Sequence, residues 1–246
     1  MLNGAVRFVR ALPVLPVVLL VGCGVAGTQF HPGVAAQVGD ETITSRHVDE
    51  VTDNYCTALE KVTKGQPQAN VEPTPLSHFS AQFATALVEK AAAEQLADDH
   101  DVEPTSSYRS DLAQLEPQIA DLDDDEQDAV REVIGAQAYT DDVLTQIGAQ
   151  SLEEQGGAEA TVADQLAEGR SLLDAWIKDH DVEVNPKYAV AVGGAEPVDT
   201  DLSFALGDTA KGGALGPADP QNPDADEDEL RAAYVAGLPA DLVCLD

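Results

Sequence analysis

The chain has 246 residues, with 13 Lys and Arg against 45 Asp and Glu, so its formal net charge is -32 at pH 7. A surface this acidic repels phosphate backbones, which argues against a nucleic acid as the partner. Aromatic residues make up only 4% of the chain, so the core must be built mainly from Ala, Val and Leu, which favours closely packed helices.

The N-terminal segment, residues 1–22, is typical of a secretory signal peptide. Two arginines precede a short apolar run that ends immediately before Cys23. The sequence Leu20-Val21-Gly22-Cys23 resembles the lipobox of bacterial lipoproteins, whose cysteine is lipidated and becomes the first residue of the mature protein. A transmembrane anchor is one alternative, but the run falls short of ~20 apolar residues and contains two prolines. A signal peptide followed by a cysteine that is not lipidated is the other alternative. We therefore expect a lipid anchor on the extracytoplasmic face of the cell membrane, followed by a flexible tether over residues 23–33.

Residues 34–192 are expected to form one mainly helical domain. Two short strands, 34–38 and 42–44, are separated by a Gly-Asp-Glu turn. A helix follows, capped by Thr44 or Ser45. Its apolar side chains recur at spacings of three or four residues, at Val48, Val51, Tyr55, Leu59 and Val62.

The same spacing predicts four further helices. They begin near Leu76, near Ser106, at the acidic run 123–126 and at Thr161. Pro117 lies inside the apolar pattern of the third helix, so we expect a kink or a break there.

Beyond the fifth helix the pattern changes to alternation, which predicts a strand at Val182 and Val184. Residues 193–246 form an acidic tail rich in Gly and Pro. One short helix is expected there over 230–236, and most of the remaining tail is expected to be poorly ordered.

The two ends of the domain resemble a known family. Residues 34–44 and 182–188 are similar to the opening and closing strands of the N-terminal domain of SurA-like periplasmic chaperones, in their actinobacterial lipoprotein branch. This resemblance implies a mainly α, SurA-N-like domain, closed by a small β-sheet from the chain's first and last strands, with an apolar groove for unfolded chains. Enzymatic members continue into a parvulin-type prolyl isomerase domain. Only 58 residues follow Tyr188 in this chain of 246, and a parvulin core needs on the order of a hundred.

The expected function is therefore binding of unfolded or extended secreted polypeptides, without ATP, metal or another cofactor. Two other functions remain open: a structural or adaptor lipoprotein that binds one envelope partner, and a residual prolyl isomerase. The candidate groove residues are large apolar side chains on the expected helix faces, and each could instead be ordinary core. They are Tyr55, Leu59, Phe79, Phe83, Leu112, Leu115 and Trp176.

Enzyme and metal motifs give no support to other functions. The sequence contains no Gly-x-Ser-x-Gly, no His-Glu-x-x-His and no Gly-rich phosphate loop, so we do not expect an enzyme. Asp-His-Asp-Val-Glu occurs twice and suggests metal binding through His100 and His180, but helix-terminal histidines beside solvated acids are the commoner arrangement. The acidic run 123–126 does not fit an EF-hand loop, which needs spaced oxygen ligands with a central Gly and a terminal Glu, because Ala129, Val130 and Arg131 occupy the relevant stretch. His47 and Glu50 have the spacing of a surface pair.

With Cys23 lipidated, Cys56 and Cys244 remain as an even pair in an oxidising compartment. A disulfide is the expected state, and two separate thiols are the alternative. Such a bond would hold the end of the tail across the helical domain, where Leu238, Leu242 and Val243 could cover part of the groove.

Overall fold

The computed structural model describes residues 32–65, 72–157, 159–188 and 225–245, which all belong to the unit formed by residues 32–246. Cys23, the expected signal peptide over residues 1–22 and most of the expected tether over residues 23–33 lie outside the described residues. The expected class is confirmed: the fold is mainly helical, with a small antiparallel sheet. The main elements are β1 (Val34–Val38), β2 (Glu41–Thr44), α1 (Ser45–Lys64), β3 (Thr74–Pro75), α2 (Leu76–Asp99), α3 (Ser106–Ile119), α4 (Asp124–Glu154), α5 (Val162–Asp179), β4 (Val182–Val184), η1 (Pro186–Tyr188), α7 (Ala225–Ala236), η2 (Ala240–Leu242) and β5 (Val243–Cys244).

The three-stranded sheet has β1 in the centre, with β2 and β4 antiparallel on either side. A two-residue turn joins β1 to β2, and Gly39 supplies the positive φ of 55° that such a turn requires. After β4, the Asn185 side chain donates to the carbonyl oxygen of Val34 at 3.0 Å. The first strand therefore pairs with the strand expected at Val182 and Val184. This is not the chain's last strand, because β5 follows it and pairs with β3 in a separate sheet.

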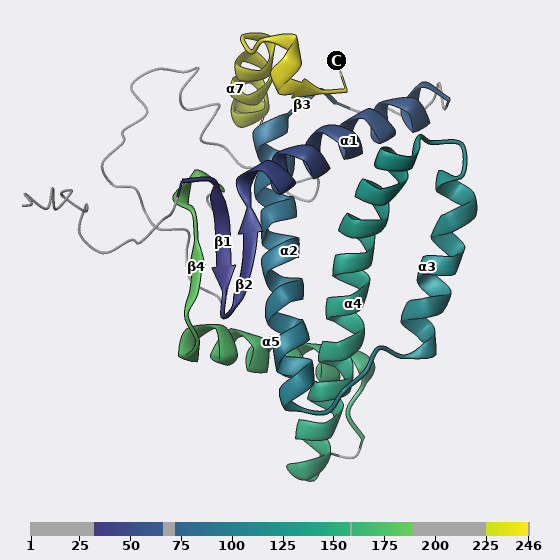
Figure 1. The fold of residues 1–246 in the computed structure, drawn as a ribbon, viewed down its shortest axis with the longest axis vertical. Helices are drawn as coiled ribbons and strands as arrows, with labels where there is room; N and C mark the ends of the chain where they lie inside the picture. Colours follow the sequence, from purple (N-terminus) through teal and green to yellow (C-terminus); the bar gives the residue numbers. More distant parts are fainter. Residues whose placement is uncertain (1–31, 66–71, 158, 189–224, 246) are drawn as a thin grey trace, which may run out of the picture. The chain divides into compact units, whose positions relative to one another are not determined.

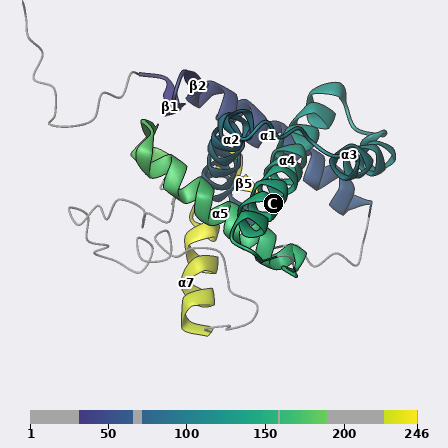
Figure 2. The same cartoon turned by 90° about the horizontal axis from the view of Figure 1, so that it is seen from below.

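Helix α2 lies between this sheet and α4 (Figure 1). Its buried residues are mostly alanines and include the run Ala91–Ala93, which leaves room for neighbours on several sides. Helix α5 crosses α2 and α4 (Figure 2). The resulting core is aliphatic, with Val88, Leu144 and Ile147 almost fully buried.

Helices α4 and α5 approach most closely at two glycines. A Cβ on Gly148 would overlap the carbonyl oxygen of Gln165, and a Cβ on Gly169 would overlap that of Leu144. The backbones can meet at this crossing because neither glycine carries a side chain.

Helix α3 differs from its expected form. It runs through Pro117 and ends at Ile119, so the expected break is absent. Pro117 lies in the last turn, where only the carbonyl of Ala113 loses its helical partner. Because Ala113 is exposed, water can solvate that carbonyl, and the loss is tolerated.

The described C-terminal segment, residues 225–245, contains more structure than the sequence predicts, and residues 193–224 of the expected tail lie outside the described residues. Helix α7 begins at Ala225, five residues before the expected start, and β5 pairs antiparallel with β3. Cys56 in α1 and Cys244 in β5, the pair expected from the sequence, form a disulfide with Cα atoms 5.6 Å apart. Val243 and Cys244 are buried, whereas Leu242 remains 48% exposed.

Candidate functional site

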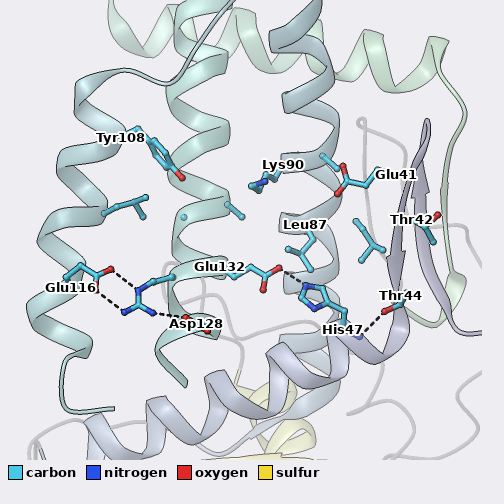
Figure 3. Close-up of a pocket in the computed structure, with 16 residues that line it drawn as sticks. Glu41, Thr42, Thr44, His47, Leu87, Lys90, Tyr108, Glu116, Asp128 and Glu132 are labelled. Carbon is cyan, nitrogen blue, oxygen red and sulfur yellow. Dashed lines mark hydrogen bonds and ion pairs between the residues drawn. The ribbon is translucent and has the colours of Figure 1, made fainter. Parts of the chain in front are cut away.

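A cleft of about 630 Å³ opens between β2, α1 and α2 on one side and α3 and α4 on the other (Figure 3). We call it the main cleft. Its apolar floor consists of Ile43, Leu87, Ala91, Leu112 and Ala136. Its charged rim consists of Glu41, His47, Lys90, Glu116, Asp128, Arg131 and Glu132. The cleft therefore combines apolar surface with charges of both signs.

His47 connects the two sides of the main cleft. Thr44 caps α1 and accepts a hydrogen bond from the backbone N–H of His47 at 3.2 Å, which places this histidine in the first helical turn. The His47 ring Nε2 lies 2.6 Å from Glu132 Oε1 in α4 (Figure 3). Glu50, the partner expected from helix spacing, instead forms an exposed ion pair with Arg46. The sequence interpretation of His47 and Glu50 as a pair is therefore wrong.

Arg131 fixes the C-terminal half of α3 to α4. Its Nε and Nη2 donate to the two oxygens of Glu116 at 2.8 and 3.0 Å, and its Nη1 donates to Asp128 at 2.7 Å (Figure 3). The hydrogen bonds from Arg131 lower the pKa of Glu116 below its usual value. The two parallel hydrogen bonds to Glu116 fix the orientation of the Arg131 guanidinium group between α4 and α3.

The N-terminal end of α3 is anchored separately. Thr105, its cap, donates to the Asp142 carboxylate in α4 through both its backbone N–H and its hydroxyl. Between the two anchors Tyr108 packs edge-on against Tyr139, with ring centroids 5.7 Å apart. Ile119 is the one residue of α3 that is buried. Helix α3 is thus fixed to α4 near both of its ends, and it has little buried apolar surface between them.

On the opposite side, α2 contributes Lys90. Its ammonium group bonds to Glu94 and lies 5.5 Å from the centroid of the Tyr139 ring. Burial, reinforced by Glu94 and Asp98, raises the pKa of Tyr139 to about 12, so this phenol is neutral at physiological pH. The charge of Lys90 is therefore already paired at the rim of the main cleft.

A second, smaller cleft of about 270 Å³ lies between α2, α4 and α5. Glu89, Asp141 and Arg170 contribute its charges, and Arg170 pairs with Asp141 at 2.7 Å. Burial raises the pKa of Glu89, and the nearby Arg170 partly opposes that shift. Thr140 also lines this cleft, and its buried hydroxyl has no hydrogen-bond partner among the described residues.

The structure separates the seven candidate groove residues. Leu112 lines the main cleft. Tyr55, Phe79 and Phe83 form an aromatic cluster between α1 and α2, with centroids 4.8 to 6.2 Å apart. Leu59 and Leu115 are partly exposed outside the main cleft.

Trp176 belongs to the aliphatic core, where it is 7% exposed. Its indole N–H donates to Asp99 at 3.1 Å, and its ring stacks on His180 with centroids 3.9 Å apart. No residue of the described C-terminal segment, 225–245, lines the main cleft, so the covering expected from Leu238, Leu242 and Val243 does not occur there.

The described ranges contain no group of three or more residues placed to hold a metal ion, and His100 and His180 lie at separate helix ends. Among these residues, no helix is both long and apolar enough to cross a membrane.

The rim residues His47, Lys90, Arg131 and Glu132 were not identified as site residues from the sequence. They come from three helices, and the sequence carries no local motif that joins them.

Comparisons of the chain with protein-family models, with curated proteins and with solved structures found no match.

Proposed function

We propose that this protein is a lipid-anchored, extracytoplasmic, chaperone-like protein that binds unfolded or extended polypeptides without ATP or a cofactor. The main cleft carries this proposal. Its volume of about 630 Å³ lies within the ~300–1,000 Å³ typical of ligand clefts, which is enough for a short stretch of chain. The apolar floor offers burial to hydrophobic side chains, and the charged rim offers partners to polar ones.

Helix α3 forms one side of the main cleft, and its weak packing supports binding of varied polypeptide sequences. Because Ile119 is its one buried residue, displacement of α3 would expose little additional apolar surface. Segments with few buried contacts are the ones that open at low free energy, and adaptable surfaces accept chemically different partners. The anchors at Asp142 and Arg131 would keep the helix attached while its middle adjusts.

The chain order supports the SurA-like part of the proposal. The helices α1 to α5 lie between β1 and β4, which pair with each other, and this is the arrangement that the resemblance implies. The extracytoplasmic location rests on the lipobox resemblance at Cys23 and on the Cys56–Cys244 disulfide, since disulfides persist in oxidising compartments.

Gly135 in α4 offers a direct test, because a Cβ placed on it would lie 3.4 Å from Leu112 Cδ2 and 4.0 Å from the Tyr108 hydroxyl. Gly135→Ala fits this space. Gly135→Leu and Gly135→Trp would extend from the same point into the main cleft. The assay measures light scattering of a chemically unfolded protein as it is diluted into buffer with or without the purified protein.

We expect the wild type and Gly135→Ala to slow aggregation at a near-stoichiometric ratio, and the two larger variants to lose most of this effect while keeping the wild-type circular dichroism spectrum. Full activity in a folded Gly135→Trp variant would exclude the main cleft as the binding site. No effect of the wild type on any aggregating client would favour the adaptor function instead. Acceleration of a proline cis–trans step beyond its uncatalysed tens of seconds would show an isomerase.

A further inference from the structure

Strand β2 forms one edge of the three-stranded sheet, because within the described part of the chain it pairs with β1 alone. All four of its residues, Glu41 to Thr44, line the main cleft. An edge strand carries a row of backbone N–H and C=O groups that point away from its sheet, and such a row can pair with another extended chain. The main cleft therefore has a polypeptide-pairing edge along one side.

The register identifies the backbone groups in question. Val38 and Glu41 flank the two-residue turn and face each other as a hydrogen-bonded pair, so Gln37 and Thr42 form the next, non-hydrogen-bonded pair. The cross-strand bond from the Thr42 hydroxyl to the Gln37 side chain, at 2.6 Å, agrees with this assignment. The peptide N–H and C=O of Thr42 consequently point away from β1. Glu41, Thr42 and Thr44 are exposed, whereas Ile43 is buried.

Charge and length indicate the occupant. The charged rim has four carboxylates against two permanent cations. Arg131 is paired with Glu116 and Asp128, and Lys90 is paired with Glu94, which does not line the cleft. Among the described residues, this leaves Glu41 and Glu132 as the rim carboxylates without a permanent cation. A cationic segment is therefore the better match. The four residues of β2 span roughly 13 Å, which corresponds to four or five residues of an extended peptide.

We propose that the main cleft binds its polypeptide by β-strand addition: an extended segment that carries apolar and basic residues on one face pairs antiparallel with β2 through the backbone N–H and C=O of Thr42. Because side chains alternate along a strand, Glu41 and Ile43 lie on the same face of β2. The apolar side chains that meet the floor and the basic side chains that meet Glu41 and Glu132 therefore occupy the same face of the added strand. This inference rests on the proposed function and specifies its substrate class and binding mode.

The test uses a fluorescein-labelled peptide, Thr-Lys-Thr-Val-Thr-Lys-Thr-Val-Thr, which has Lys and Val on one face of an extended strand, and fluorescence anisotropy with the purified protein. A matched depsipeptide, in which esters replace the central amides, keeps the side chains and removes the N–H donors. We expect the depsipeptide to bind about three- to tenfold more weakly, since it loses the N–H that donates to the Thr42 carbonyl and its ester carbonyl is a weaker acceptor for the Thr42 N–H. A version with Glu in place of Lys should also bind more weakly.

Two protein variants separate local charge from net charge. Glu41→Gln lies on β2, and Glu183→Gln makes the same change on β4, at the opposite edge of the same sheet. We expect Glu41→Gln to weaken binding of the cationic peptide about two- to fivefold, as for an exposed ion pair, and Glu183→Gln to leave it unchanged. In addition, exchange of the Thr42 amide hydrogen, followed by NMR, should slow at least tenfold on peptide binding.

Each contrary result overturns a defined part of the proposal. Equal affinity of peptide and depsipeptide, or an unprotected Thr42 amide in the complex, would exclude strand addition while leaving the proposed function intact if aggregation is still suppressed. Absence of both peptide binding and aggregation suppression would refute the function as well. Protection of Thr42 in the free protein that rises with protein concentration would assign this edge to a second copy of the chain.

Discussion

Replacement of Gly148 by Ala tests the close approach of α4 and α5. The new Cβ would overlap the carbonyl oxygen of Gln165 and lie 2.7 Å from the backbone nitrogen of Gly169. A carbon–oxygen contact needs roughly 3.3 Å, so the helices must separate by more than about 1 Å. Because the obstacles are backbone atoms, no side-chain rotation can relieve the overlap.

Overpacking typically costs about 1–3 kcal/mol and sometimes more, while replacement of a helical glycine by alanine stabilises by about 0.5–1 kcal/mol. Because no side chain can relieve the overlap, we expect a net loss in the upper part of the difference, about 1–2.5 kcal/mol. For a domain of this size, each kcal/mol lowers Tm by roughly 2–4 °C, so Gly148→Ala should unfold about 2–10 °C below the wild type. Gly169→Ala should behave similarly because its Cβ would meet the backbone of Leu144.

Gly135→Ala is the matched control, since it makes the same chemical change in the same helix. Its Cβ has only an ordinary contact, 3.4 Å from Leu112 Cδ2, so we expect stabilisation by about 0.5–1 kcal/mol. Thermal and urea unfolding followed by circular dichroism measures all three variants. Unchanged stability of Gly148→Ala, or an equal loss in Gly135→Ala, would refute the argument from helix proximity.

Burial raises the pKa of the Glu89 carboxyl group in the folded protein. The folded protein therefore keeps the Glu89 proton to a higher pH than the unfolded chain does. Folding stability consequently falls as pH rises from the unfolded-state pKa of Glu89 to its folded-state pKa. Glu89→Gln should therefore be more stable than the wild type at pH 7 and lose this advantage below about pH 4, near the unfolded pKa of Glu; urea unfolding that shows the same difference at both pH values would disprove this. Cys56 and Cys244 are 188 residues apart, so their bond should stabilise the fold by up to about 5 kcal/mol in the loop-entropy model. The unreduced protein should have a mass two hydrogens below the dithiol, whereas maleimide labelling of both thiols without reduction would contradict the bond. Cys23→Ala should move the protein from the membrane fraction to the soluble one, and its retention after a carbonate wash would exclude lipidation as the anchor.

The helices could be predicted because their signals are local. Apolar residues spaced by three or four positions identified α1 and its buried face at Val48 and Val51. The strands β3 and β5 could not be predicted, since two residues carry no periodicity and their pairing joins Thr74 to Cys244 across most of the chain. Pro117 did not end α3, because one lost hydrogen bond near an exposed helix end is tolerated.

The main cleft could not be predicted from local sequence patterns either, because its residues come from distant parts of the chain. His47 meets Glu132, which is 85 residues away, whereas the helix spacing pointed to Glu50. Periodicity shows which face of a helix is apolar, but it does not show which part of that face meets another helix and which part is left open. Tyr55, Phe79 and Phe83 consequently bury one another, and Leu112 on the loosely packed α3 lines the main cleft.

Site-specific photo-crosslinking tests the central claim, that polypeptides bind in the main cleft, most directly. A photoreactive residue is placed at Leu112, which lines the cleft, or at the adjacent and exposed Ala113, which does not. Each protein is irradiated with an unfolded client, and crosslinked peptides are identified by mass spectrometry. Our account predicts abundant client crosslinks from position 112 and few from position 113. Equal yields from the two positions, or crosslinks obtained only from a third probe at Phe79 in the aromatic cluster, would contradict it.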